Sequence, residues 1–315
     1  MRRILRYLGT LIGAFWFYFG SAPGFELVMQ TPWWKLLIFE VLGCLMFPTP
    51  PSMDIRGWQE INSLNGASWS LMWEYVANIF YALIIRRLPT VMLGVIVAMS
   101  AFLTLDLALN WDVFSLLEQR QWALYTVIGG FGLTPDQIYI GVCRLIYPFF
   151  GGLLLYRLSK LRIRLPHGGM LWCSVAIATA LSMPCIGGDE HPWLNGLYCA
   201  LVILLLFPAI VATGAGSPLV GKRTTALCKF LGLISYPLYI THYPMIYVQM
   251  NWAAQHADAP LGTHIWVAVS IFVVSIAVAY ASVIVWDLPI RAWLSARFLH
   301  RKRQADTVAV VEKAV

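Results

Sequence analysis

Two stretches of this chain place hydroxyl, carboxyl and imidazole groups at helical spacing among apolar residues. Ser70 and Glu74 are separated by one helical turn, and so are Tyr239 and His242, so each pair would share a helix face. A neutral imidazole can take a proton from a hydroxyl and return it, which suits His242 to work as a general base. The sequence therefore indicates proton-transfer chemistry where these two segments meet.

Both segments also have a structural interpretation that needs no chemistry. Serine and asparagine side chains hydrogen-bond neighbouring membrane helices, so Ser70 and Asn78 could form a packing seam, and His242 could bond to a neighbouring helix. A carboxylate inside a membrane span costs about 2.5–3.5 kcal/mol on insertion scales, which favours a functional role for Glu74. For the serine and the histidine, both interpretations stay open.

Arginines at two further places could also take part. Arg144 lies well inside another apolar segment, where a guanidinium needs an anionic partner or a water-filled cavity. Glu74 is the candidate partner. Arg3 and Arg6 precede the first apolar segment; they either anchor the topology or bind a phosphate, because guanidinium groups bind phosphate in a bidentate manner.

Composition determines the kind of element that must position these groups. Of 315 residues, 59% are hydrophobic and 12% are charged, and the mean hydropathy is +0.70. A soluble domain carries about 25% charged residues, so this chain must fold in lipid. The net charge of +7 is then explained by basic cytoplasmic loops rather than by a nucleic-acid partner. The six cysteines have no CxxC spacing, and no metal site is expected.

Apolar segments of about 17–25 residues predict an all-α polytopic transmembrane bundle with about eight spans. Residues 33–47 are shorter and contain Lys35 and Glu40, which predicts a re-entrant or interfacial helix; residues 116–131 are similar. The eight expected spans are residues 4–20, 68–85, 90–109, 138–156, 169–186, 193–213, 231–250 and 264–286.

The basic residues orient this bundle. With eight spans, most of the 22 Lys and Arg residues fall in loops on the side of the N-terminus, so the positive-inside rule places both termini in the cytoplasm. We expect one transmembrane domain over residues 1–296 and a basic, disordered cytoplasmic tail over 297–315.

Residues 65–81 and 230–245 resemble acyltransferase family 3, the bacterial integral-membrane O-acyltransferases. The first carries the Ser-Trp-Ser-Leu-x-x-Glu element, with Ala67 in place of a proline, and the second carries Ile-Ser-Tyr-x-Leu-Tyr-x-x-His. Weaker matches follow in the same order as in the family: Arg3-x-x-Arg6, residues 141–156 and residues 287–294.

This resemblance implies an enzyme of the bacterial inner membrane. The family transfers an acyl group, often acetyl, from cytoplasmic acyl-CoA to a hydroxyl of a cell-envelope glycan or exopolysaccharide. Arg3 and Arg6 would then lie near the CoA phosphates. Ser70, Glu74, Tyr239 and His242 would line the central site, with Arg144 or Tyr239 donating to developing charge; the acyl-CoA is the only cofactor implied, and no metal takes part.

The resemblance also implies ten spans, two more than the chain provides. In the family, one upstream span carries an arginine and, about eleven residues later, the histidine regarded as the catalytic base. No residue of this chain matches that element, so the base is either that upstream histidine, which the resemblance favours, or His242. The alternatives are a truncated, inactive membrane partner of an active enzyme, and a small-solute transporter that uses prolines and charges inside its spans.

Overall fold

The computed structural model describes residues 2–21, 25–118, 120–158, 162–165 and 168–299, and the side chains of 7–297 within these ranges. All regular secondary structure in this part of the chain is helical, which confirms the expected fold class. The α-helices of the first half are α1 (Arg2–Phe15), α2 (Glu26–Gln30), α3 (Trp33–Leu45), α4 (Ser68–Leu83), α5 (Thr90–Leu109) and α6 (Pro135–Arg157).

The second half of the chain is also helical, and α10 is its longest helix. Short π-helical turns join several of them end to end, namely η6 (Val202–Leu206), η7 (Ser282–Asp287) and η8 (Ser295–Leu299). The α-helices are α7 (Gly169–Ser182), α8 (Trp193–Leu201), α9 (Phe207–Gly216), α10 (Lys222–Gln255), α11 (Leu261–Ala281) and α12 (Leu288–Leu294). The expected tail begins inside η8, and its residues 300–315 lie outside the described part.

Four helices are long and apolar enough to cross a membrane by length and composition: Thr90–Leu109, Pro135–Arg157, Trp193–Gly216 and Leu261–Arg297. The other expected spans are also helical at the expected places. Of these, α1, α4 and α7 are shorter than a full crossing, and α10 is long but carries tyrosines, prolines and His242 in its middle. The short expected helix at 33–47 is α3, whereas residues 116–131 form turns and one short 3-10 helix rather than a helix of that length.

Helix ends follow local chemistry. Helix α5 begins after Pro89 and ends at Asn110, which takes the left-handed conformation (φ 52°) that asparagine tolerates. Helix α6 begins with Pro135, whose missing N–H costs nothing in a first turn, and Asp136 follows where the helix dipole favours an acid. These ends place the start of α6 beside the loop that precedes α4.

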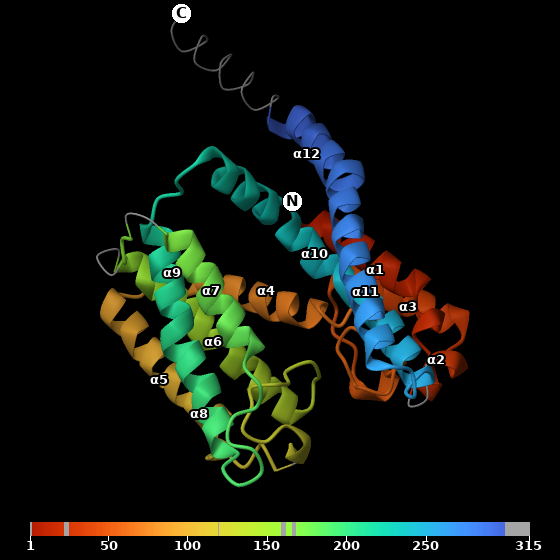
Figure 1. The fold of residues 1–315 in the computed structure, drawn as a ribbon, viewed down its shortest axis with the longest axis horizontal. Coiled ribbons are helices and arrows are strands. Elements are labelled where there is room, and N and C mark those ends of the chain that lie inside the picture. Colours follow the sequence, from red (N-terminus) through yellow and green to blue (C-terminus); the bar gives the residue numbers. More distant parts are fainter. Residues whose placement is uncertain (1, 22–24, 119, 159–161, 166–167, 300–315) are drawn as a thin grey trace, which may run out of the picture.

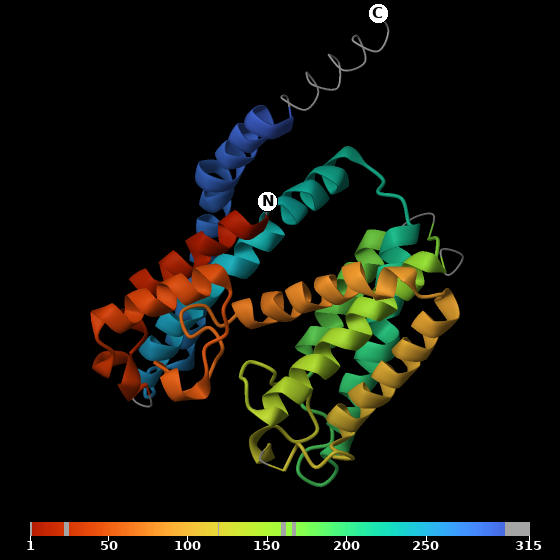
Figure 2. The same ribbon diagram turned by 180° about the vertical axis from the view of Figure 1, so that it is seen from behind.

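The helices form two groups (Figure 1). One group contains α5 to α9, and the other contains α1, α2, α3, α11 and α12 packed with most of α10. Helix α4 runs across between the groups, as the view from behind also shows (Figure 2). Because α4 begins beside the middle of α10, groups from distant parts of the sequence meet there.

Candidate functional site

The segment before α4 rests on the middle of α10 through a backbone group that a proline leaves unpaired. Pro244 has no N–H, so the carbonyl of Ile240, one turn earlier in α10, lacks its helical donor. The Asn65 side-chain amide donates to this carbonyl at 2.7 Å, and Asn65 is fully buried. The bond fixes Asn65, and with it Gly66 and Ala67, against α10.

Ala67 then brings the two predicted segments together. Its carbonyl accepts hydrogen bonds from the Tyr239 hydroxyl at 3.0 Å and from the Ser70 hydroxyl at 3.3 Å. The hydroxyls of Ser70 and Tyr239 also contact each other directly. The two motif stretches, far apart in the sequence, therefore meet through these two hydroxyl groups.

His242 lies on the next turn of α10 and has one ring nitrogen available. Its Nδ1 is 3.0 Å from the backbone carbonyl oxygens of Leu238 and Tyr239. Carbonyl oxygens only accept, so Nδ1 must carry the proton, and the lone pair of the neutral ring lies on Nε2. The rings of His242 and Tyr239 are 6.0 Å apart. His242 is thus oriented by its own helix with Nε2 as the basic atom.

Arg144 reaches the same place from α6, but its partners differ from the expected one. Its guanidinium donates to the Gly129 carbonyl and lies over the Trp69 ring, 4.4 Å from the ring centre. Trp69 is the residue before Ser70 in the first turn of α4, so Arg144 lies beside the start of that helix. The expected pairing with Glu74 is wrong: the structure forms no such ion pair among the described residues. The Gly129 carbonyl and the face of the Trp69 ring stabilise the charge of the guanidinium instead.

Glu74 is farther from the centre of the site. It lies on α4 one turn after Ser70, and its side chain is exposed. Its backbone carbonyl accepts a hydrogen bond from the Asn78 side chain at 2.8 Å. The structure thus brings Ser70, Tyr239, His242 and Arg144 together, with Glu74 at the edge.

Arg3 and Arg6 belong to α1, the helix that packs on α10. Their side chains lie outside the described part of the chain. Their expected contact with CoA phosphates therefore stays a prediction. No three His, Cys, Asp or Glu side chains within the described ranges gather as a metal site would need.

Sequence reasoning missed a buried ionisable cluster next to this site. Glu60, in the loop before α4, is 5% exposed and accepts a hydrogen bond from the Tyr247 hydroxyl at 2.6 Å. Arg56 is 1% exposed, donates to the Ser63 carbonyl at 3.0 Å and lies 3.6 Å from the centre of the Tyr247 ring. Charged residues in a Pro-rich loop are ordinarily solvated, so nothing in the sequence pointed to the burial of Arg56 and Glu60.

Burial determines the acidity of Glu60. Removal from water raises the pKa of the Glu60 carboxyl to about 7, although the hydrogen bond from Tyr247 and the charge of Arg56 lower it; Asp54 raises it further. A carboxyl with this pKa changes charge near neutral pH.

Glu60 also lines a cleft of about 690 Å³. Three segments form it: the loop before α4, residues 122–137 leading into α6, and the second half of α10. Its lining residues are Trp58, Gln59, Glu60, Trp122, Phe131, Thr134, Asp136, Gln137, Tyr243 and Met250. Tyr243 connects this cleft to the hydroxyl cluster, because its ring is 5.8 Å from that of His242.

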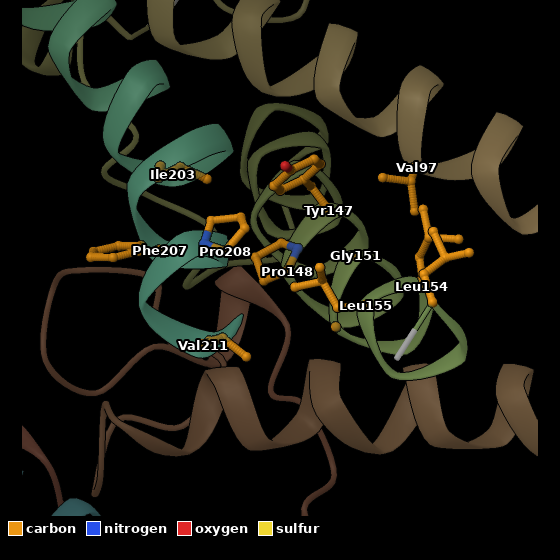
Figure 3. Close-up of a pocket in the computed structure, with 12 residues that line it drawn as sticks. Val97, Tyr147, Pro148, Gly151, Leu154, Leu155, Ile203, Phe207, Pro208 and Val211 are labelled. Carbon is orange, nitrogen blue, oxygen red and sulfur yellow. The ribbon is translucent and has the colours of Figure 1, made fainter. Parts of the chain in front are cut away.

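A second cavity, of about 220 Å³, lies between α6 and α9 (Figure 3). Its lining is apolar, and Pro148 and Pro208 contribute to it from the two helices. Its one polar side-chain group is the Tyr147 hydroxyl, which already donates to the Leu204 carbonyl at 2.7 Å. The lining of this cavity therefore offers no unengaged side-chain group for proton transfer.

Comparison with known families decides what kind of protein carries this cluster. The family model of the acyltransferase domain matches residues 1–284. The chain belongs to acyltransferase family 3. Neither the curated proteins nor the solved structures that were searched contain a match to it.

The acyltransferase family 3 match extends over α1 to α11 and includes every candidate residue named above. It therefore confirms the resemblance found in the sequence and supports a membrane acyltransferase in general. The late 287–294 motif follows the matched range; there Asp287 and Arg291 form an ion pair at 2.7 Å within one helical turn. That motif has a local structural role at the end of the long C-terminal helix.

Proposed function

We propose that the chain is an O-acyltransferase of the bacterial inner membrane, with both termini in the cytoplasm. It moves an acyl group, most simply acetyl, from cytoplasmic acyl-CoA to a hydroxyl of an envelope glycan or exopolysaccharide. The single observation that carries this proposal is the convergence of Ser70, Tyr239, His242 and Arg144 around the start of α4, where Arg144 lies over the Trp69 ring. The family match supports the reaction class.

In this mechanism Nε2 of His242 takes the proton of the acceptor hydroxyl. The alkoxide attacks the thioester carbonyl carbon and forms a new C–O bond, while the carbonyl oxygen gains negative charge. The intermediate then collapses, the C–S bond breaks, and the leaving thiolate takes the proton back from the imidazolium. The products are the ester and free CoA, so atoms and charge balance.

Two donors serve the developing oxyanion. The Arg144 guanidinium and the Tyr239 hydroxyl are both partly withdrawn from solvent; the Tyr239 proton, which the Ala67 carbonyl accepts in this structure, would turn to the oxyanion when substrate is bound. Donors fixed before the reaction stabilise charge that develops in the transition state. Ser70 holds the Tyr239 hydroxyl in place, and Glu74 orients the acceptor or the base from the edge of the site.

Removing the imidazole tests the mechanism. With the chain in membrane vesicles, labelled acetyl-CoA and extracted envelope glycan, His242→Gln is expected to lower acetyl transfer by about 10²-fold or more, the usual contribution of a general base. His256→Gln, a change at an exposed histidine past the end of the site helix, is the matched control. Full activity of His242→Gln would contradict the mechanism and show that His242 is not the base.

Acyl-CoA binding separates an enzyme from a small-solute transporter. If Arg3 and Arg6 hold the CoA phosphates, the double change of both to alanine is expected to weaken acyl-CoA binding by about tenfold or more. Arg86→Ala with Arg87→Ala removes two exposed arginines at the far end of α4 and is the control. Equal acyl-CoA affinity in all three proteins would remove the proposed donor site.

A further inference from the structure

The cleft beside Glu60 combines two kinds of surface. Trp58 and Trp122 keep 40% and 63% of their surface exposed while they line it, although the Trp58 ring also packs against Phe25, with ring centres 4.7 Å apart. Tyr243 adds a third ring from α10. Aromatic faces of this kind cover apolar C–H surface and attract cations. The cleft is therefore suited to a ligand that has apolar faces and polar edges.

Polar side chains are distributed among these rings. Gln59 and Thr134 line the cleft, and the structure gives no side-chain hydrogen bond to Gln59. Gln137 is already engaged, since its side-chain oxygen accepts from the Gly130 amide at 2.8 Å. Hydroxyl groups both donate and accept, so amide and carboxylate side chains can bind them in several orientations.

The charges of the lining are all of one sign. Glu60 and Asp136 contribute carboxyl groups, and no lysine or arginine lines the cleft among the described residues. Two loop arginines lie outside this lining, although Arg56 acts on the charge of Glu60: Arg56 contacts Ser63 and the Tyr247 ring, and Arg120 donates to the carbonyls of Thr126 and Ile128. A ligand carboxylate or phosphate would thus meet two acids and no available cation.

We propose that this cleft is the acceptor site, that it binds a neutral or amine-bearing polyhydroxy chain, and that Glu60 and Asp136 exclude acceptors with carboxylate or phosphate groups. The inference rests on the proposed acyl transfer. It deepens that function because the cleft reaches the catalytic cluster through Tyr243, next to His242.

Direct binding in the absence of acyl-CoA tests the cleft. The full chain in lipid nanodiscs is titrated by calorimetry with maltotetraose, a chitosan tetramer and tetragalacturonate. The neutral and amine-bearing probes are expected to bind at least about tenfold more tightly than the galacturonate, because two like charges repel the latter. Equal or tighter binding of galacturonate, or no saturable binding of any probe, would overturn the proposal.

Charge substitutions place the effect in the cleft. Asp136→Asn is expected to reduce the ratio of the maltotetraose affinity to the tetragalacturonate affinity several-fold. Gln59→Lys adds a positive charge to the lining and is expected to reduce this affinity ratio further. Because Gln59 is exposed, the substitution should not disturb folding. Asp258→Asn, an exposed acid outside the lining, is the control, and a shift there as large as in Gln59→Lys would contradict the assignment.

The binding assay and the transfer assay can each refute one proposal without refuting the other. The expected order of affinities without any acetyl transfer would refute the transferase function and leave the cleft as a saccharide site. Acetyl transfer with no charge preference among the probes would refute this acceptor site and leave the transferase function in place.

Discussion

At the scale of single residues, the Tyr239 hydroxyl joins α10 to the start of α4 in the proposed catalytic cluster. It donates to the Ala67 carbonyl and contacts the Ser70 hydroxyl. Tyr239→Phe removes all of this while keeping the ring. Acetyl transfer is expected to fall about 10²-fold in kcat with little change in KM for acetyl-CoA, as for loss of an oxyanion donor.

Steady-state kinetics of the purified protein measures this. Tyr280→Phe, a half-exposed tyrosine on α11, is the control. A raised KM with unchanged kcat would assign Tyr239 to binding the donor instead.

The close packing of the segment before α4 against α10 leaves no room for a side chain at Gly66. A Cβ there would lie 2.3 Å from Tyr243 Cε1, 2.8 Å from the Tyr247 hydroxyl and 2.9 Å from Glu60 Oε1. Gly66→Ala is expected to destabilise the protein by about 1–3 kcal/mol and to impair transfer, because the segment before α4 must shift off α10. Gly232→Ala, on α10 with open space around it, should leave thermal unfolding nearly unchanged. Equal melting behaviour of both variants would contradict this packing.

The pKa of Glu60 predicts how acceptor selection depends on pH. Tyr243 and Tyr247 face Glu60 from α10, Arg56 and Asp54 act on it from its own loop, and Asp136 lines the same cleft. Because burial raises the pKa of Glu60 to about 7, its negative charge is lost as the pH falls through that value.

Tetragalacturonate stays ionised over this range, so it should bind several-fold more tightly at pH 6 than at pH 8. Glu60→Gln should remove most of that difference. Calorimetry at pH 6 and pH 8 measures the two affinities. Tighter binding of tetragalacturonate at pH 8 would contradict a repulsive charge on Glu60.

At the scale of elements, one proline and one asparagine fix α4 relative to α10. Asn65→Ala leaves the buried Ile240 carbonyl without a donor, at an expected cost of about 1–3 kcal/mol. Pro244→Ala restores an N–H that can bond this carbonyl within the helix. Asn65→Ala should therefore cost less in the Pro244→Ala background than alone. Thermal unfolding of the four proteins in a double-mutant cycle measures this, and strict additivity would contradict it.

Most helices could be predicted, but the contacts between them could not. Hydropathy places α5 and α6 within a few residues, because an apolar run has to be helical in lipid. Loop packing determines which groups Arg144 contacts and how Arg120 is buried within residues 117–128. The spacing of residues in one sequence does not predict how loops pack. The motifs indicated Ser70 and Tyr239, whereas Glu60 carried no recognisable pattern.

At the scale of the whole molecule, the catalytic cluster and the acceptor cleft lie where the two groups of helices meet. The proposed function requires α10 to run from the cytoplasmic face to the outer face of the membrane. Acyl-CoA and the acceptor would then reach the site from opposite sides.

Cysteine labelling tests this orientation. Cys185, exposed in the loop before α8, is expected to react with a membrane-impermeant maleimide in intact cells when it is the only cysteine. Arg164→Cys, exposed between α6 and α7 in a cysteine-free background, is expected to react only after permeabilisation. The reverse pattern would invert the topology.

The central claim is that this cluster transfers an acyl group to a hydroxyl. The most direct measurement is a single turnover of purified chain in nanodiscs, with acetyl-labelled CoA and maltotetraose, compared with His242→Gln. The account predicts a labelled acetyl ester on the sugar in the wild-type chain and about 10²-fold slower formation in the variant. No ester with the wild-type chain, or the same rate in both proteins, would contradict it.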